Sequence, residues 1–269
     1  MKEYIIAEHE DGSIVTVADV HRVLLEMMKD IDRVCQKHKI PYWLSGGSAL
    51  GAVRHGGFIP WDDDMDIAMM REDYERFIKK AVFDLPERYV FQCFENDNKF
   101  NVCVPSKLVL KGTKIKEYNT LMKSKCEHGD GLFIDIFVCD PIATQTHKDL
   151  PRRLWSFFLM CIITVFENLH INPLPLKRAF MRNAKKYAEK NKNSESIGYA
   201  LTWCFNPILH PVRYPKSSVF PLQRVPFEDA QFQIPNDPKW MLDIEVSPSH
   251  MSYPPLKDQK PKHIKDAWL

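Results

Sequence analysis

The spacing of apolar residues predicts alternating helices and short strands in the first half of the chain. Residues 15–39 carry apolar side chains at every third or fourth position, which predicts an amphipathic helix with one stripe on a core. Helices are also predicted at 49–55 and 71–84 from their composition. Apolar runs that alternate with turn residues predict strands at 40–44, 64–70, 89–94, 103–110 and 131–138.

The pattern changes in the second half. From about residue 147 to residue 192 helix-forming residues dominate, and from about residue 206 proline becomes frequent while the periodicity fades. We therefore predict an α+β fold with two parts. Residues 1–142 form a catalytic core with a mixed sheet flanked by helices, and residues 143–269 form a helical region and an irregular segment that wraps back to complete the substrate site.

One long apolar run stands out at residues 154–166. It is shorter than the roughly 18 apolar residues that a membrane-spanning helix needs. We interpret it as a buried core helix. Because Lys148, Arg152 and Arg153 precede it, an interfacial helix with peripheral membrane contact is the alternative.

Composition limits the partners and the compartment. The chain has 37 basic and 35 acidic residues, so no global charge favours nucleic acid as a partner. Its seven cysteines include no C-x-x-C pair, which argues against a disulfide framework and a zinc ribbon. The first residues lack an apolar run of signal-peptide length. We expect a cytoplasmic protein, either free or at the inner face of the membrane.

Glycines gather at the predicted turn between a strand and a helix. Five of the ten glycines lie within residues 46–57. Glycine lets backbone N–H groups approach an anion, and a helix N-terminus favours negative charge. We therefore predict a phosphate cradle at Gly46, Gly47 and Ser48, with Ser48 as the N-cap. An ordinary tight turn is the alternative interpretation.

Two aspartates, Asp64 and Asp66, begin the strand that follows. The two-residue repeat of a strand places both carboxylates on one face, where they repel each other unless a cation lies between them. Hard oxygen ligands suit Mg²⁺ or Mn²⁺, which typically share their coordination with substrate phosphates. An acidic surface turn is the alternative for residues 62–66, and it applies above all to Asp62 and Asp63.

A third carboxylate, Asp135, lies within the apolar strand predicted at 131–138. Burial of an unpaired carboxylate is costly, so Asp135 needs a metal ion, a cationic partner or a raised pKa. A structural ion pair with Arg54 or Lys107 is the alternative. Together with Asp64 and Asp66 it forms a candidate catalytic and metal-binding set.

The motifs resemble those of the LicD/fukutin family of phosphotransferases, within the nucleotidyltransferase superfamily. The resemblance rests on IPYWLSGGSALGAVRH at 40–55, GFIPWDDDMDI at 57–67 and GLFIDIFVCD at 131–140, and it extends to the region around 220–228. It implies a nucleotidyltransferase-like fold. Many members carry a Tyr-Gly pair near the C-terminus where this chain has Glu245 to Pro248, which leaves the closure of that region open.

The resemblance also implies an activity: transfer of a phosphorylated alcohol from a CDP-linked donor to a sugar hydroxyl. We expect phosphocholine transfer from CDP-choline to a glycan or lipid-linked glycan of the teichoic acid or lipopolysaccharide type. Transfer of ribitol phosphate or glycerol phosphate, or nucleotidyl transfer with release of pyrophosphate, are alternatives on the same fold. A non-enzymatic, Ca²⁺-dependent glycan-binding module is a further alternative.

Roles for single residues follow as hypotheses. Asp64 and Asp66 would hold one or two metal ions, and Asp135 would be either a further ligand or the base that accepts the proton of the acceptor hydroxyl. Arg54 and Lys107 are candidates for contact with phosphate oxygens. Trp61 is a candidate for recognition of a trimethylammonium group by an aromatic face.

Overall fold

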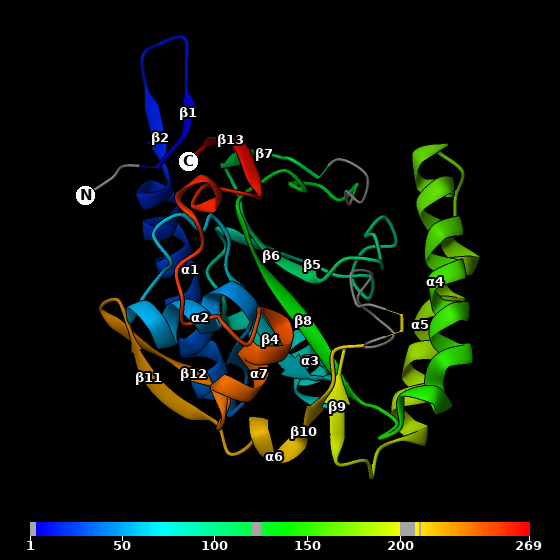
Figure 1. Ribbon diagram of the computed structural model, residues 1–269. Coiled ribbons are helices and arrows are strands. Elements are labelled where there is room, and N and C mark those ends of the chain that lie inside the picture. The colour runs from blue at the N-terminus through cyan, green and yellow to red at the C-terminus, as the bar shows by residue number, and fades with distance from the viewer. Residues whose placement is uncertain (1–3, 120–124, 200–207, 210) are drawn as a thin grey trace.

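The computed structural model describes residues 4–119, 125–199, 208–209 and 211–269. Its described residues form a mixed α+β structure around a seven-stranded sheet (Figure 1). The prediction of an α+β fold with a mixed sheet is confirmed. The strands of this sheet are β3 (Trp43–Leu44), β4 (Asp66–Met70), β5 (Tyr89–Gln92), β6 (Ser106–Leu110), β8 (Phe133–Pro141), β9 (Ser196–Gly198) and β10 (Tyr214–Pro215).

Strand β8 is the centre of the sheet. It pairs in parallel with β4 and antiparallel with β6, and its last residues pair with β9. The order is β10-β9-β8-β4-β3, with β6 on the other side of β8 and β5 beyond β6. Because β9 and β10 come from residues after 142, the two halves of the chain share one sheet. The boundary between residues 142 and 143 itself stays a prediction.

Three two-stranded sheets lie around this centre. Strands β1 (Ile5–Glu8) and β2 (Ile14–Thr16) form a hairpin, as do β11 (Gln223–Phe227) and β12 (Ala230–Ile234). Strand β13 (Ile264–Trp268) pairs with β7 (Lys114–Glu117). The prediction of an irregular C-terminal segment is therefore wrong in part, because strands of only five residues, one of them with Pro226 inside it, have too little periodicity to be recognised.

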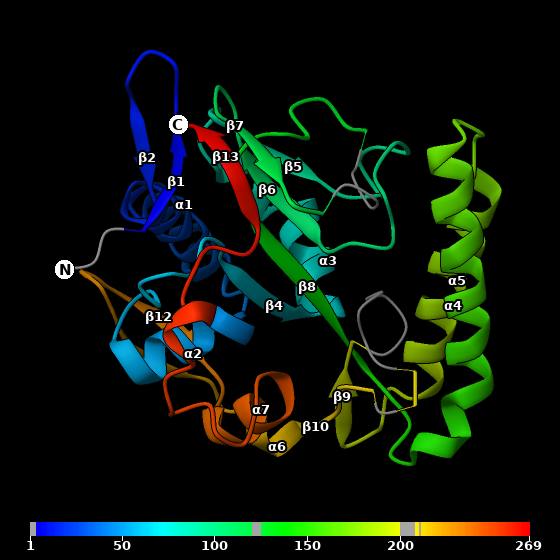
Figure 2. The ribbon, with the colours of Figure 1, turned by 45° about the horizontal axis from the view of Figure 1, so that its top comes forward.

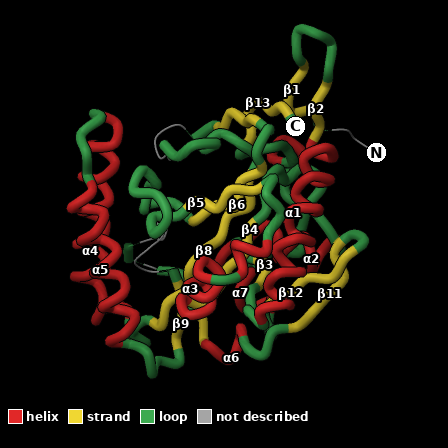
Figure 3. The backbone as a smooth tube through the Cα atoms, turned by 180° about the vertical axis from the view of Figure 1, so that it is seen from behind, coloured by secondary structure: helices red, strands yellow, loops and turns green. Residues whose placement is uncertain are grey.

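The first helix, α1 (Val17–His38), has the predicted amphipathic form. Thr16 and Asp19 make a capping box, and Lys39 ends the helix in the left-handed conformation. Its buried stripe includes Leu24, Met28 and Ile31. Helices α1 and α3 (Arg71–Lys79) both contact β8, and they lie on the side of the sheet that is seen in Figure 3.

Two further helices lie close together toward the viewer in Figure 1. Helix α2 (Gly46–His55) packs on α7 (Pro238–Glu245), and the short α6 (Lys216–Val219) contacts α7. The observed α2 begins three residues before the predicted helix. Ser45, not Ser48, is its N-cap residue, so the prediction of Ser48 as N-cap is wrong.

Helices α4 (Thr146–Asn168) and α5 (Leu174–Lys190) pack on each other and lie apart from the other helices, at one side of the molecule (Figure 2). They pack through a separate small core that includes Leu159, Ile163 and Phe180. The prediction of a buried core helix at 154–166 is only half right, because Trp155 and Phe158 of α4 are each 52% exposed. No helix in the described residues is long and apolar enough to cross a bilayer.

Candidate active site

The register of the central sheet brings three predicted site residues into one row. In the parallel pairing of β4 with β8, Asp66 lies opposite Asp135, and in the antiparallel pairing of β6 with β8, Lys107 lies opposite Asp135. Side chains that are directly opposite on neighbouring strands project from the same face of a sheet. The sheet therefore holds two carboxylates and one ammonium group in line across three strands.

Asp64 joins this row from the turn before β4. Its Oδ2 lies 3.1 Å from Nε2 of His263, the residue directly before β13. Burial, with the charges of Asp63 and Asp135, raises the pKa of Asp64 to about 7. The charge of Asp135 is one cause of this raised pKa, so the carboxylate before β4 and the carboxylate on β8 repel each other.

The other two carboxylates are perturbed in the same direction. Burial raises the pKa of Asp66 well above its ordinary range, and the charges of Asp64 and Asp135 add to that effect. Burial raises the pKa of Asp135 to about 6, and the nearby ammonium of Lys107 opposes the increase. A group of partly buried carboxylates whose pKa values are all raised is typical of a functional site.

The carboxylate of Asp135 has fewer hydrogen-bond and ion-pair partners than a buried carboxylate normally has. Its Oδ1 is buried and accepts no hydrogen bond from the described residues, and its ion pair with Nζ of Lys107 is long, at 3.9 Å. The same ammonium lies 3.7 Å from Glu117 and 3.2 Å from the centre of the Phe133 ring. The alternative prediction, an ion pair of Asp135 with Lys107 or Arg54, is thus met only by a long contact with Lys107, and Arg54 does not contact Asp135.

The three carboxylates are the residues that could hold a hard cation. Among the described residues, no group of three or more His, Cys, Asp or Glu side chains is arranged to hold a metal ion by itself. Asp64 and Asp66 nevertheless repel each other and Asp135, and Oδ1 of Asp135 accepts no hydrogen bond from the described residues and contacts only the distant ammonium of Lys107. The donor set suits a cation that takes its remaining ligands from water and substrate.

The glycine turn is fitted closely to the acidic strand. Gly46 has a positive φ of 52°, and the Oγ of Ser48 accepts a 2.9 Å hydrogen bond from the backbone N–H of Asp66. A Cβ on Gly47 would lie 2.4 Å from Oδ2 of Asp62. A side chain at residue 47 would therefore force the Asp62 carboxylate to move, whereas phosphate binding by the turn stays a prediction.

The start of α2 is already occupied by an anion of the chain itself. The backbone N–H of Gly46 donates a 2.8 Å hydrogen bond to Oε2 of Glu245, the last residue of α7. The hydroxyl of Tyr214 donates to the other oxygen, and Ser45 Oγ lies 3.4 Å from both. Burial raises the pKa of Glu245, and its charge contributes to the raised pKa of Asp66.

The sequence did not identify Glu245 as a site residue. The chain's departure from the usual Tyr-Gly pair at this position was the only available signal, and it did not indicate that the carboxylate contacts the N-terminus of α2. Tyr199 was also missed: its hydroxyl lies 2.8 Å from Ser45 Oγ, and its ring contacts Phe137. These contacts join segments that are about 150 to 200 residues apart.

Asp63 connects the site to the C-terminal strand. It is 1% exposed, and its oxygens accept hydrogen bonds from the backbone N–H groups of Lys262, His263 and Ile264. The alternative of a solvated surface turn is therefore wrong for Asp63. Burial, with the charge of Asp64, raises the pKa of the neighbouring Asp62 well above its ordinary value, so Asp62 is not simply solvated either.

Two predicted contact residues lie outside the row of charges. Nη1 of Arg54 donates to the carbonyl oxygens of His250 and Ser252, at 2.6 and 3.1 Å, so this guanidinium holds the segment after α7. Trp61 is 7% exposed and contacts the rings of His55 and Tyr253. Their predicted roles in substrate contact stay predictions, and in this conformation both groups make contacts within the chain.

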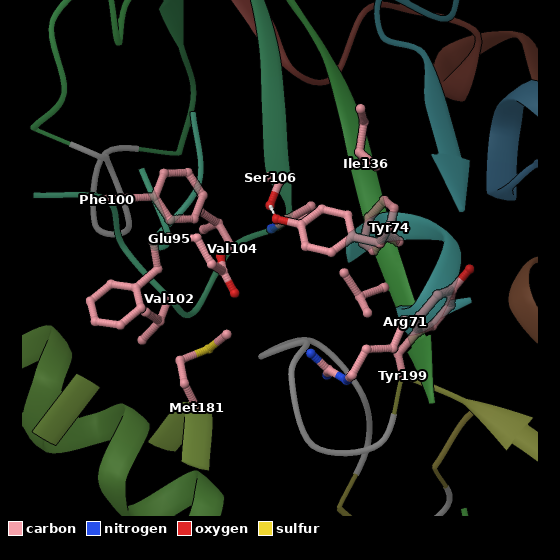
Figure 4. A pocket seen from close by; sticks show the side chains of 14 residues that line it. Arg71, Tyr74, Glu95, Phe100, Val102, Val104, Ser106, Ile136, Met181 and Tyr199 are labelled. Carbon is pink, nitrogen blue, oxygen red and sulfur yellow. Dashed lines mark hydrogen bonds between the residues drawn. The ribbon is translucent and has the colours of Figure 1, made fainter. Parts of the chain in front are cut away.

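A small cavity lies beside the row, where β8 has left β6 and not yet met β9 (Figure 4). It has a volume of about 40 Å³, enough for a few water molecules. Tyr74, Phe137, Met181 and Tyr199 contribute to its lining, and the Tyr74 hydroxyl lies 2.6 Å from Oγ of Ser106. Phe137 follows Asp135 by two residues on β8, so this cavity adjoins the site.

Comparison with known proteins gives a consistent picture. The family described as LicD/FKTN/FKRP, nucleotidyltransferase domain, matches residues 39–157, a range that contains the glycine turn and the row of charges. The lipopolysaccharide cholinephosphotransferase LicD of Haemophilus influenzae is 27% identical over 95% of this chain and 98% of its own length.

Shorter matches involve animal proteins. The ribitol 5-phosphate transferase FKRP of Homo sapiens is 46% identical over 52 residues, which cover 19% of this chain and 10% of that protein. The ribitol-5-phosphate transferase FKTN of Homo sapiens is 28% identical over 86 residues, 31% of this chain and 19% of its own length. The strong similarity to these relatives is thus local.

Proposed function

Since residues 39–157 match the family described as LicD/FKTN/FKRP, nucleotidyltransferase domain, we propose that this chain transfers phosphocholine from CDP-choline to a glycan hydroxyl. The three relatives described above are a cholinephosphotransferase and two ribitol-phosphate transferases. The alignment with a lipopolysaccharide cholinephosphotransferase extends over nearly all of both chains, which supports choline as the alcohol. The acceptor would be a glycan of the lipopolysaccharide or teichoic acid type.

The observation that carries the proposal is the row formed by Asp66, Asp135 and Lys107, together with Asp64 at its edge. Asp64 and Asp66, with Asp135, would hold Mg²⁺ or Mn²⁺. When bound, such a cation neutralises charge that develops on the departing CMP. A bound cation would offset the burial that raises the pKa of all three carboxylates and the repulsion that adds to it for Asp64 and Asp66.

The chain's own groups would position the reacting atoms. The acceptor hydroxyl attacks the phosphorus that bears choline, the bond from this phosphorus to the oxygen of CMP breaks, and the hydroxyl proton moves to a carboxylate. Asp135 suits that last role, because burial raises its pKa and its Oδ1 has no hydrogen-bond donor among the described residues. Lys107 would hold a phosphate oxygen.

The first turn of α2 would contact the donor diphosphate from the other side. The N–H groups of Gly47 and Ser48 have no acceptor within the helix, because the first four N–H groups of any α-helix lack one. The N–H of Gly46 is engaged by Glu245. A phosphate at this turn would therefore bind beside the Glu245 carboxylate or displace it.

Binding and turnover can be tested separately. Calorimetry with CDP should show binding that depends on Mg²⁺, and Asp66→Asn should weaken it by about a hundredfold because one charged ligand is lost. Asp229→Asn, at a carboxylate that is 70% exposed between β11 and β12, is the matched control and should bind as the unaltered protein does. Unchanged CDP binding in Asp66→Asn would contradict the proposed site.

Turnover distinguishes the reactions that this fold supports. With CDP-choline and a teichoic-acid-type saccharide, we expect free CMP and phosphocholine on the glycan. Release of pyrophosphate from a nucleoside triphosphate would overturn phosphotransfer in favour of nucleotidyl transfer. Turnover of CDP-ribitol in place of CDP-choline would retain phosphotransfer and overturn the choice of alcohol. Binding of Ca²⁺ and glycan without any CDP binding would indicate a binding module.

A further inference from the structure

Helix α4 has an exposed apolar face that lies opposite its buried face. The residues Leu154, Trp155, Phe158, Cys161 and Val165, called here the α4 stripe, recur at the three-and-four spacing that places them on one side of a helix. Leu154, Trp155, Phe158 and Val165 are 51 to 53% exposed, and Cys161 is also exposed. The rings of Trp155 and Phe158 stack at 5.6 Å.

The opposite face of α4 is also apolar, and it is the one that packs on the protein. Leu159 and Ile163 are buried against Phe180 of α5. Residues 154–166 contain no charged side chain at all. A helix that is apolar all round is suited to burial on both sides, yet the described residues bury only one of them. Contact of the α4 stripe with a second apolar environment would therefore be favourable, because it would remove the stripe from water.

Helices α4 and α5 with the turn between them, called here the α4–α5 hairpin, carry charges that indicate what that environment is. Residues 146–190 contain nine Lys or Arg residues and three Asp or Glu residues, whereas the rest of the chain has twenty-eight and thirty-two. Asp149 pairs with Arg153, and Glu167 pairs with Lys177, so both acidic side chains are internally compensated and buried.

The basic groups of the hairpin are mostly exposed. Lys148 near the start of α4 and Arg178, Arg182, Lys186 and Lys190 on α5 all face solvent. Only Glu189 is an exposed acidic residue within residues 146–190. The hairpin thus combines an apolar stripe with a surplus of accessible positive charge, the combination found in helices that lie in the surface of an anionic membrane.

We propose that the α4–α5 hairpin docks the protein on a membrane surface rich in anionic phospholipid. The α4 stripe enters the boundary between headgroups and acyl chains, and the basic side chains of the hairpin bind lipid phosphates. The helix lies in the surface and does not cross it, in agreement with the absence of a spanning helix in the described residues. A second copy of the hairpin fits the stripe less well, because it carries the same positive charge.

Vesicle sedimentation tests this docking without any substrate. Vesicles of phosphatidylcholine with about one-third phosphatidylglycerol should bind the protein, and pure phosphatidylcholine vesicles should bind it much less. Binding should weaken as salt is added, because salt screens exposed charges. Trp155→Gln with Phe158→Gln should reduce the affinity by about tenfold per side chain, since each buries a large apolar group in the membrane.

Matched control variants distinguish specific docking from nonspecific adsorption to the vesicles. Phe83→Gln removes an aromatic side chain that is 79% exposed elsewhere, and it should leave vesicle binding unchanged. Arg178→Gln and Arg182→Gln should each weaken binding to anionic vesicles about fivefold. Lys79→Gln, at a lysine on α3 that is 69% exposed, should have no such effect.

The outcomes that overturn the docking are distinct from those that overturn the enzymatic activity. Equal binding to both vesicle types, no binding at all, or unchanged binding in the Trp155/Phe158 double variant would refute it. So would a dimer in solution that the same double variant dissociates, because the stripe would then be an interface between copies. The double variant should retain CDP binding and turnover of a soluble saccharide, so loss of those activities would point to misfolding instead.

Discussion

Replacing Asp64 by asparagine should make the protein more stable at neutral pH. The substitution keeps the size of the side chain and removes one negative charge from a group in which Asp63 and Asp135 repel it. It also removes the ion pair with His263, but that imidazole is 53% exposed, so the loss costs little. Relief of burial and repulsion therefore dominates the change in the free energy of unfolding.

The magnitude follows from the pKa of Asp64, which rises from 3.8 to about 7 in the folded protein. One pKa unit corresponds to about 1.4 kcal/mol, so the ceiling is about 4 kcal/mol. The side chain is 20% exposed, and solvent screens part of the interaction, so we expect about 2 kcal/mol at pH 8. For a chain of this size, that raises the melting temperature by about 4 °C.

The sign of the pH dependence is fixed by linkage. A carboxyl group whose pKa is raised by folding holds its proton more tightly in the folded state, so its contribution to stability is full below 3.8 and is lost as the pH rises through about 7. The difference between Asp64→Asn and the unaltered protein should therefore be largest at about pH 8 and shrink as the pH falls toward 5.

Urea unfolding at several pH values, without divalent cations, measures this difference. Asp63→Asn is the matched control with the opposite sign, because the Asp63 carboxylate accepts the N–H groups of residues 262–264, and its loss should cost about 2 kcal/mol. If Asp64→Asn is as stable as the unaltered protein at pH 8, or if its advantage grows toward low pH, the mutual repulsion inferred for the carboxylates is refuted.

Two further predictions concern α2, one its N-terminus and one its interior. Glu245→Gln removes the charge at the start of α2, so calorimetry should show about fivefold tighter CDP binding. The control Glu228→Gln, near the other end of α2, should not change the CDP affinity. Weaker CDP binding in folded Glu245→Gln would contradict the reasoning. Gly51→Ala should lower the free energy of unfolding by about 2 kcal/mol or more, because its Cβ would lie 2.4 Å from the backbone oxygen of Gly57. Gly12→Ala, with open space but a positive φ of 84°, should cost only about 1 kcal/mol, and equal losses for both would refute the steric argument.

Local patterns predicted the parts of the site that lie close together in the sequence. The pattern in residues 64–70 predicted a strand, which the structure begins at Asp66, so that Asp64 lies two residues before it, and the lone charge in an apolar run marked Asp135. The register that places Asp66 opposite Asp135 could not be predicted, because it depends on pairing between strands almost seventy residues apart. Spacing within one segment carries no information about such pairing.

The predictions that failed have physical reasons of the same kind. Periodicity cannot tell which side of residues 154–166 is buried, because both sides of that helix are apolar. The contact of Glu245 with Gly46 depends on the packing of α7 against α2, which no local pattern encodes. The same holds for Arg54, whose partners are carbonyl oxygens nearly two hundred residues later.

The hydrogen bonds from the 262–264 backbone to Asp63 have a consequence for the order of events during synthesis. Asp64 and Asp66 leave the ribosome early, but His263 and Glu245 follow about two hundred residues later. Until then β13 cannot pair with β7, and α7 cannot cover the start of α2. The acidic strand therefore lacks its final neighbours while the next two hundred residues are made, and the site is completed only when residues 245–264 have folded back onto it.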